Sequence, residues 1–485
     1  MTDTRFQSDE WKIIETRFEP GRGRDSESIF ALGNGMMGQR ANFEETYTGD
    51  TLQGSYVAGV YYPDKTVVGW WKVGYPEYFA KVPNAPSWTG IIVRIDREEL
   101  DLAKCEVRSF RRELDMRQGL LTRTFTAVMS SGRVAEVVAE RFLSMHEPEK
   151  AAIRYSVRIT GGGGNLELIP WLNADVFNED ANYDEKFWEN ESSASDGKRA
   201  VVVAQTRKTE FVVATAMENT FALNGKPAKG TTKITTTDKT AHCAFNSAYD
   251  DGDTFTVIKY AAVLSSFNHP AEGLADKAMS TAGDAAAKGF DAMLADHRGA
   301  WEKKWEHGDI VIKGDIAAQQ GIRFNIFHLN QTYTGEDPRL NIGPKGFTGE
   351  KYGGSTYWDT EAFAFPFYLS TADTHVARNL LIYRYKHLEK AIENARKLGF
   401  TNGAALYPMV TMNGEECHNE WEITFEEIHR NGAIAFAIFN YVRHTGDQNY
   451  LAEYGLEVLI AISRFWAQRS RDRKSTRLNS SHTDI

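Results

Sequence analysis

The sequence predicts a multidomain protein whose β-rich N-terminal part is followed by a helical part. From about residue 10 to residue 268, short alternating segments are separated by Gly, Asn and Asp. Between Pro270 and His307 the composition changes to Ala, Lys, Met, Asp and Glu, and beyond Gly314 the apolar spacing becomes helical. These observations predict an antiparallel β-sandwich, a helical linker and then an α/α barrel. The expected boundaries are 1–268, 269–313 and 314–471.

Strands are expected where apolar and polar residues alternate or where β-branched residues accumulate. Leu121 to Val128 alternates, and Phe211 to Met217 and Thr254 to Leu264 are rich in β-branched and aromatic residues. Turns between strands are expected at Gly161–Gly164, at Asn224-Gly225 and at Asp251-Gly252, since glycine adopts the positive φ that such turns require. Frequent strands without intervening helices predict a large antiparallel sandwich.

The helical elements are expected in the linker and in four later segments. In the linker, Trp301 and Trp305 are four residues apart and share a helix face. The later helices are expected at Ile322 to Leu329, Val376 to Ala391 with Gly399 as its stop, Thr424 to Val442, and Asp447 to Trp466. Long loops at 333–360 and 406–423 separate them, and such loops are expected to gather at one end of the barrel and form the site.

Composition narrows the classes of partner. The 485 residues are 42% hydrophobic and 25% charged, which excludes disorder as the main state, and the net charge of −10 makes nucleic acid and anionic membrane poor partners. Three scattered cysteines do not form a disulfide framework, and the N-terminus resembles no secretory signal. We therefore expect a cytoplasmic protein. The 11 Trp and 20 Tyr suit either a large core or stacking against sugar rings.

The last fourteen residues, 472–485, are interpreted as foreign to the natural protein. Asp472 to His482 reads DRKSTRLNSSH, which matches the direct translation of a common sequencing adapter. We therefore expect the natural sequence to continue differently after Arg471, so that the chain is a fragment of its parent.

The segment Gly33–Gly38 has the spacing of a dinucleotide-binding fingerprint, but not its context. Such a site needs a helix after the glycines to meet the pyrophosphate, and residues 42–54 are polar and turn-prone instead. We expect a glycine-lined turn that brings the backbone close to another loop.

The segment from Asn413 to Arg430 crowds six glutamates and two histidines together. Charges this dense are expected to raise one another's pKa, which suits acid catalysis or hydrogen bonding to hydroxyl groups. Two Glu-x-x-His pairs, Glu415 with His418 and Glu426 with His429, match carboxylate metal centres in spacing only, and no metal is expected. Thr424 and Glu427 also fit a helix capping box.

Trp358 and Asp359 follow a glycine-rich loop and precede an aromatic run. A tryptophan face beside a carboxylate can pack on a sugar ring and accept hydrogen bonds from its hydroxyl groups. The alternative is a helix start with acidic residues near its dipole.

Together these segments resemble glycoside hydrolase family 65, especially its maltose-cleaving members. The similarity runs to Arg471 and is carried by LGNGMMGQRANFEE, YTGDTLQGSYVAGVYYPDKTVVGWWK, IRFNIFHLNQTY, GGSTYWDTEAF, ALYPMVTMNGEECHNEWEITFEEIHRN and RFWAQR. The resemblance implies a β-sandwich, a helical linker and the first part of an (α/α)6 barrel. It also implies a homodimeric parent without metal or organic cofactor, in which inorganic phosphate is the co-substrate that cleaves a disaccharide with inversion. Met409, where kojibiose and trehalose enzymes tend to have Trp, favours maltose, with β-glucose 1-phosphate and glucose as products.

The resemblance also assigns residues. Trp358 and Asp359 match the pair that binds the transferred glucose, and Trp421 and Glu427 are the expected acceptor-side contacts. The family's general acid is the glutamate of a Gly-Pro-Asx-Glu-Tyr motif, which this sequence lacks, so no catalytic residue is assigned here. We expect the acid and the phosphate site beyond Arg471. The alternatives are cleavage of trehalose, kojibiose or nigerose, hydrolysis, or a noncatalytic carbohydrate-binding fragment.

Overall fold

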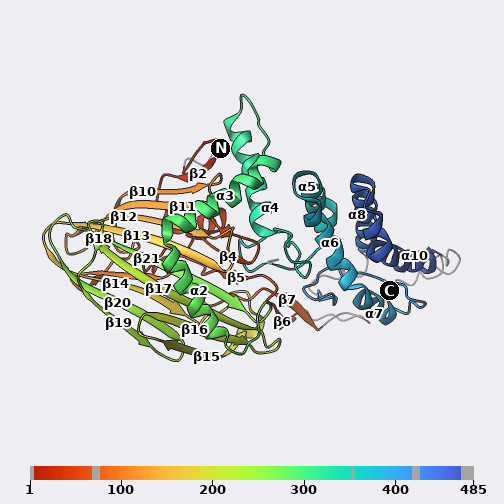
Figure 1. The fold of residues 1–485 in the computed structure, drawn as a ribbon, viewed down its shortest axis with the longest axis horizontal. Helices are drawn as coiled ribbons and strands as arrows, with labels where there is room; N and C mark the ends of the chain where they lie inside the picture. The colour runs from red at the N-terminus through yellow and green to blue at the C-terminus, as the bar shows by residue number, and fades with distance from the viewer. Residues whose placement is uncertain (1–4, 68–76, 352–353, 418–426, 471–485) are drawn as a thin grey trace. The chain divides into compact units, whose positions relative to one another are not determined.

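The computed structural model describes residues 5–67, 77–351, 354–417 and 427–470. They form two compact units, each described by itself below (Figure 1). The first, called the β unit, comprises residues 1–62, 82–333 and 345–353. The second, called the helical unit, comprises residues 63–81, 334–344 and 354–485.

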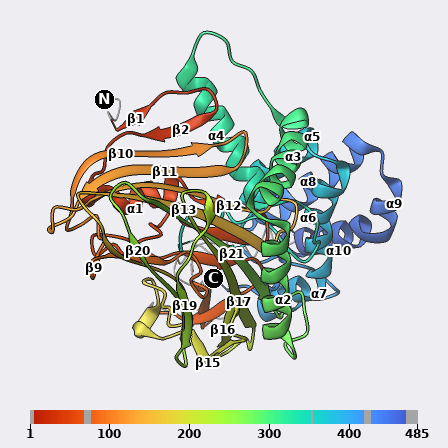
Figure 2. The same cartoon turned by 60° about the vertical axis from the view of Figure 1, so that its left-hand side comes forward.

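The β unit is built around two antiparallel sheets, which Figures 1 and 2 show in two views. The larger sheet has the strand order β1 (Phe6–Gln7), β2 (Lys12–Glu15), β10 (Glu106–Asp115), β11 (Leu120–Val128), β12 (Val134–Leu143), β13 (Lys150–Thr160), β21 (Thr254–Ser265), β17 (Val212–Leu223), β16 (Arg199–Thr206) and β15 (Trp188–Ser195), with β18 (Lys226–Pro227) beside β17. The smaller sheet has the order β19 (Thr231–Thr236), β20 (Thr240–Tyr249), β14 (Gly164–Asn173), β8 (Ile91–Ile95) and β9 (Glu98–Glu99).

The register explains why the sheets face each other. Phe125, Val137, Val157 and Phe255 are successive partners across β11, β12, β13 and β21, and all four side chains are buried. Such a row forms one apolar sheet face because side chains alternate along each strand. Phe221 of β17 stacks on Phe245 of β20 at 4.5 Å, which joins the two sheets. The predicted sandwich is therefore confirmed.

The glycine motif at residues 33–38 forms a hairpin rather than a nucleotide-binding loop. β3 (Leu32–Gly33) pairs with β4 (Met37–Gln39), and β5 (Ser55–Val57) pairs with β4, so a strand follows the glycines where a helix would be required. A Cβ at Gly38 would lie 2.1 Å from the side chain of Phe347, which shows the expected close approach of another loop.

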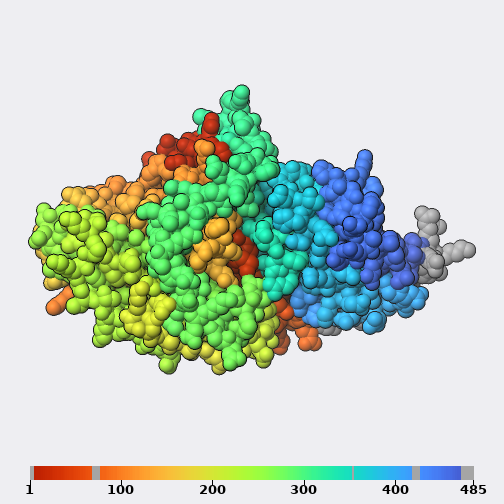
Figure 3. Space-filling view, viewed as in Figure 1, coloured from red at the N-terminus to blue at the C-terminus, as the bar shows by residue number. Residues whose placement is uncertain are grey.

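Three long helices belong to the β unit: α2 (Leu274–Lys288), α3 (Phe290–Gly308) and α4 (Ile316–Thr332). Helix α2 packs on strands β16, β17 and β21 and forms part of the surface shown in Figure 3. Trp301 and Trp305 share a buried face of α3, as predicted, and Phe327 of α4 stacks on Trp301 at 4.6 Å.

Packing divides the chain at other points than the predicted boundaries. Helix α4 was expected to open the helical domain, but Gln331 bonds to the backbone of Gly33 and Ala31, and Arg323 lies 3.6 Å over Trp11. These contacts attach α4 to the β unit. The division into segments 1–268, 269–313, 314–471 and 472–485 stays a prediction, and the tail lies outside the described residues.

The remaining short elements of the β unit are η1 (Pro20–Arg22), α1 (Gly23–Ile29) and η2 (Asn182–Asp184). The helical unit contains the two-stranded pair β6 (Tyr62–Lys65) and β7 (Tyr78–Lys81), the π-helical turn η3 (Thr360–Ala364), and then α5 (Phe365–Thr371), α6 (Thr374–Lys386), α7 (Leu388–Lys397), α8 (His429–Thr445), α9 (Gln448–Tyr450), η5 (Leu451–Gly455) and α10 (Leu456–Ser470).

Two helix boundaries in the helical unit test the sequence prediction. Gly399, with φ of 89°, ends the α6–α7 segment as expected. The predicted start of the next helix at Thr424 is wrong, because α8 begins at His429 and Ile428 precedes it without a side-chain cap. Glu427 therefore precedes the helix instead of occupying its first turn, and Thr424 lies outside the described residues. The (α/α)6 barrel stays a prediction.

Candidate functional site

Trp358 and Asp359 lie where a β-bridge leads into a helix. Thr356 and Thr411 exchange two backbone hydrogen bonds, of 2.8 and 3.1 Å, so the chain enters Trp358 from a fixed point beside the 405–417 loop. The Trp358 ring meets the edge of the His429 ring at 4.7 Å and is half-buried. One part of the indole is thus supported by protein while another part stays accessible.

The Asp359 carboxylate has no polar partner among the described residues. It is half-buried, it starts the turn η3 without capping it, and none of the described residues donates a hydrogen bond or an ion pair to it. Asp359 occupies the position before η3 and Glu361 lies in its first turn, so the alternative interpretation, a helix start with acidic residues near its dipole, is confirmed. A half-buried carboxylate beside an indole face is available to accept hydrogen bonds from a ligand's hydroxyl groups.

A buried ion pair lies directly beside these two residues, and the sequence analysis did not identify it. Arg384 Nε donates to Glu361 Oε1 at 2.7 Å and Nη2 donates to Glu361 Oε2 at 2.8 Å. Both side chains are 2% exposed. Burial lowers the pKa of Arg384, but the attraction of Glu361 outweighs burial and raises it, so the guanidinium stays charged.

The 405–417 loop, which carries Thr411 of the β-bridge, is fixed by a second buried ion pair. Glu416 accepts hydrogen bonds from the backbone of Met409 at 2.6 Å and Val410 at 3.3 Å, and it pairs with Arg430 at 3.3 Å. Arg430 Nε also donates to the carbonyl of Tyr407 at 2.6 Å. Glu416 thus holds the backbone of its own loop in place.

The prediction that the crowded glutamates raise one another's pKa is wrong for Glu415. Burial opposes its charged form, but hydrogen bonds from Tyr78 at 2.8 Å and Lys390 at 3.1 Å outweigh burial and lower the pKa of Glu415. Each described glutamate of the 413–417 segment has its own cationic partner, supplied by a distant part of the chain.

The other predicted site residues are placed only in part. Glu427 is half-buried and lies two residues before α8. Trp421 lies outside the described residues, as do His418 and Glu426 of the two Glu-x-x-His pairs. In the part of the chain that the structure describes, no group of three or more His, Cys, Asp or Glu side chains is arranged to hold a metal ion.

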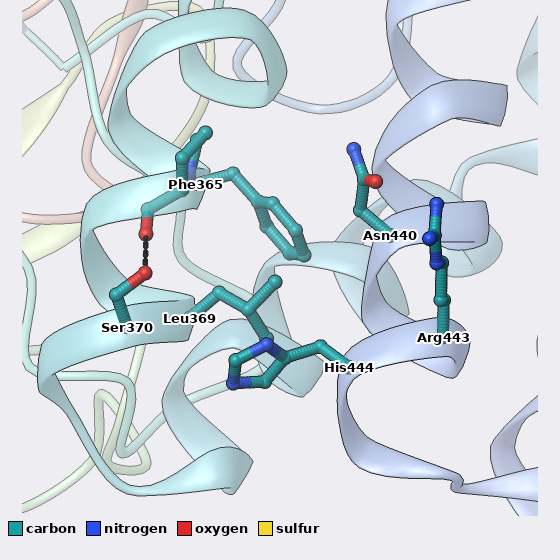
Figure 4. Close-up of a pocket in the computed structure, with 7 residues that line it drawn as sticks. Phe365, Leu369, Ser370, Asn440, Arg443 and His444 are labelled. Atoms are coloured by element: carbon teal, nitrogen blue, oxygen red, sulfur yellow. Dashed lines mark hydrogen bonds between the residues drawn. The ribbon is translucent and has the colours of Figure 1, made fainter.

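A separate pocket of about 350 Å³ opens between α5 and α8 (Figure 4). Phe365, Leu369 and Ser370 line it from α5, and Asn440, Arg443 and His444 line it from α8. Ser370 is hydrogen-bonded to the carbonyl of Pro366 in its own helix. None of these residues belongs to the predicted site, so the pocket is distinct from the Trp358–Asp359 pair.

Trp358 and Asp359 thus place an indole beside a carboxylate that has no polar partner among the described residues, at a loop-to-helix junction. The chain matches the profile of the glycosyl hydrolase family 65 N-terminal domain over residues 13–304, and that of the family's central catalytic domain over residues 323–480. The chain belongs to glycosyl hydrolase family 65.

Relatives of known name agree with this assignment. The chain is 47% identical to the maltose phosphorylase of Bacillus subtilis, 29% identical to an alpha,alpha-trehalose phosphorylase of Thermoanaerobacter brockii and 28% identical to a kojibiose phosphorylase of Halothermothrix orenii. These alignments cover 96%, 95% and 95% of the chain and 60%, 60% and 59% of the relatives. The chain thus spans about 60% of the length of these relatives.

A solved structure titled as a putative kojibiose phosphorylase from human microbiome shares the fold. Its TM-score is 0.86 at 27% identity, and the match covers 95% of this chain and 60% of the other. The catalytic-domain match does not support the prediction that the chain lacks its acid and phosphate site, and that prediction stays a prediction. Within the described residues, no helix has both the length and the apolar character needed to span a bilayer.

Proposed function

We propose that this chain is the N-terminal part of a cytoplasmic, homodimeric, inverting disaccharide phosphorylase that converts maltose and phosphate to β-glucose 1-phosphate and glucose. The observation that carries the proposal is the 47% identity to a maltose phosphorylase, against 29% and 28% to relatives named for trehalose and kojibiose. An inverting hydrolase needs two carboxylates, whereas phosphate is already a nucleophile, so the phosphorylase needs one acid and a phosphate pocket.

Trp358 and Asp359 are proposed to bind the glucose unit that is transferred. The indole face would pack on the pyranose ring, and the Asp359 carboxylate, which has no polar partner among the described residues, would accept hydrogen bonds from its hydroxyl groups. Trp421 and Glu427 are proposed as contacts on the acceptor side. We assign the proton donor to none of these residues, because the motif that carries it in the family does not occur in this sequence.

Calorimetric titration with glucose and maltose tests the binding pair. We expect Trp358→Ala and Asp359→Asn to abolish the binding heat of the wild-type chain. Asp373→Asn is the matched control, because Asp373 also starts a helix of the same unit without capping it and is exposed. Equal heats from the wild type and the two site variants would remove the proposed site.

Product analysis tests the reaction. We expect no phosphate-dependent release of glucose from maltose by this chain alone, and detectable release would overturn the assignment of the acid outside it. Glucose 1-phosphate yields from maltose, trehalose, kojibiose and nigerose, compared in a form extended to include the Gly-Pro-Asx-Glu-Tyr motif, identify the disaccharide. A chain that binds sugar while the extended form cleaves none of the four would instead be a noncatalytic carbohydrate-binding protein.

A further inference from the structure

The side chain of Arg384 contacts the chain on both sides of the Trp358–Asp359 pair. Its Nη2 donates to the carbonyl of Tyr357 at 3.3 Å, one residue before Trp358. Its Nε and Nη2 hold both carboxylate oxygens of Glu361, two residues after Asp359. One planar guanidinium therefore contacts the two ends of the five-residue segment 357–361, in which Trp358 and Asp359 are half-buried.

The backbone of Arg384 is held by a separate contact. Tyr407, which is fully buried, donates its hydroxyl hydrogen to the carbonyl of Arg384 at 3.1 Å. The Tyr407 backbone is held in turn by Asn431 Oδ1, which accepts from its amide at 3.0 Å, and by Arg430, which donates to its carbonyl. The pair and the 405–417 loop are thereby joined through one continuous set of buried polar contacts.

The residues inside the segment need this external support because they make few contacts of their own. Thr360 is anchored by hydrogen bonds from its hydroxyl to Ile342 O at 3.0 Å and Asn341 Oδ1 at 3.1 Å. The Asp359 side chain has no polar partner among the described residues, and the Trp358 side chain contacts the rings of Phe363 and His429. A rigid neighbouring shell is what keeps such ligand-facing groups in a productive geometry.

We propose that Arg384 is a positioning residue that presets the orientation of Trp358 and Asp359 for a pyranose ring. The inference rests on the proposed sugar-binding role of the pair. Lysine cannot replace arginine here, because a single ammonium group cannot span the Glu361 carboxylate and the Tyr357 carbonyl in one plane.

Fluorine NMR of the chain labelled with 5-fluorotryptophan tests the positioning without any ligand. The chain has 11 tryptophans, and loss of one resonance in Trp358→Phe assigns Trp358. We expect Arg384→Lys to shift or broaden this resonance while Trp466, in α10 of the same unit, keeps its position. An unchanged Trp358 resonance in folded Arg384→Lys would overturn the inference, as would equal shifts at Trp358 and Trp466.

Arg123→Lys is the matched control, because Arg123 is an equally buried arginine that holds carboxylates in the β unit. It should leave the Trp358 resonance unchanged. If Arg384→Lys does not fold, Glu361→Asp replaces it, since shortening the carboxylate arm should shift the same resonance, and no shift there would overturn the inference.

Glucose titration then separates this inference from the proposed function. We expect Arg384→Lys to bind glucose at least tenfold more weakly than the wild type, and unchanged affinity would overturn the positioning role. If the wild-type chain binds neither glucose nor maltose, the binding role of Trp358 and Asp359 fails, while the ligand-free spectrum still decides whether Arg384 orients them.

Discussion

Both compact units bury an arginine against carboxylates, but the two arginines are set in different surroundings. In the β unit, Arg123 lies between Glu44 at 2.6 Å and Glu45 at 2.5 and 2.6 Å, and its guanidinium packs 4.4 Å over Phe43. In the helical unit, Arg384 has Glu361 as its carboxylate partner. Trp358 and Asp359, which lie shortly before Glu361 in the chain, are only half-buried.

The difference shows that a buried contact between an arginine and a carboxylate can have two different roles. Arg123 attaches a buried loop to strand β11, and every residue from Asn42 to Glu45 except Phe43 is itself buried, so the cluster closes a core. Arg384 contacts the Tyr357 carbonyl before, and the Glu361 carboxylate after, the half-buried Trp358 and Asp359, so this contact stabilises a segment that is partly accessible. Variants that remove one carboxylate distinguish the two situations most strongly.

The largest effect is expected from Glu361→Ala. This change leaves the Arg384 guanidinium buried without a carboxylate partner, which typically costs about 3–5 kcal/mol. Glu45→Ala should cost less, about 1–3 kcal/mol, because Arg123 keeps a carboxylate partner in Glu44, which it shares with Arg141. Denaturant unfolding followed by hydrogen exchange in peptides of each unit measures both losses. Equal losses would show that the number of partners does not matter.

The next largest effect on stability is expected from alanine substitutions at two glycines that have close neighbours. Ala at Gly38 would place its Cβ 2.1 Å from Phe347, which we expect to cost about 1–3 kcal/mol through displaced packing. Ala at Gly414 would meet the His387 ring at 2.7 Å and also has to adopt a φ of 92°, so it should cost about 1 kcal/mol more. Thermal unfolding of the two variants, each assigned to its unit by hydrogen exchange, compares them. A more stable Gly414→Ala than Gly38→Ala would contradict the contribution of backbone conformation.

Acid sensitivity should also distinguish the units. Burial lowers the pKa of His297 and His328 in the β unit and of His387 in the helical unit to about 4 in each case. Between pH 6.5 and 4 the unfolded chain therefore binds protons that the folded chain does not, and the free energy of unfolding falls as the pH falls. Among the described residues of the β unit, Glu350 opposes this trend: burial and Asp180 raise the pKa of Glu350 to about 7, so its stabilising effect appears as the pH falls from about 7.

Glu350→Gln removes the opposing group and should make the β unit lose stability more steeply between pH 6.5 and 5. One titrating group contributes at most about 1.4 kcal/mol per pH unit. Hydrogen exchange in both units at several pH values measures the slopes, and the helical unit serves as the internal control. A β unit whose slope does not change would show that Glu350 is ionised throughout this range.

The sequence predicted the secondary-structure elements better than the contacts between side chains. Alternation along Leu121 to Val128 placed β11 correctly, and the same alternation directs Arg123 to the core, but a single sequence does not show that Glu44 and Glu45 meet it there. Trp358 and Asp359 were found because they adjoin in the chain. Glu361 and Arg384 were missed because they are 23 residues apart and their pairing depends on the packing of η3 against α6.

The glutamate-rich segment shows the same limit. Charge density predicted mutual repulsion, whereas Glu415 and Glu416 are separated by the cations that they contact, Lys390 and Arg430. The spacing of Thr424 and Glu427 satisfies a capping rule, but α8 begins at His429 and Glu427 precedes it, while Thr424 lies outside the described residues. Local patterns therefore selected the candidate residues, and tertiary contacts determined the electrostatics of the glutamate-rich segment.

The smallest effect is expected from an exposed ion pair with the same chemistry. Arg22 and Asp25 pair at 2.7 Å, with about half of each side chain exposed. Water and salt screen such a pair, and ordering two long side chains offsets its attraction, so Asp25→Asn should change the free energy of unfolding by less than about 0.5 kcal/mol. Denaturant unfolding at low and at physiological salt measures the change. A loss comparable to that of Glu361→Ala would mean that pairing alone, without burial, accounts for the strength of the Arg384 contact, and the contrast between buried and exposed arginines would then fail.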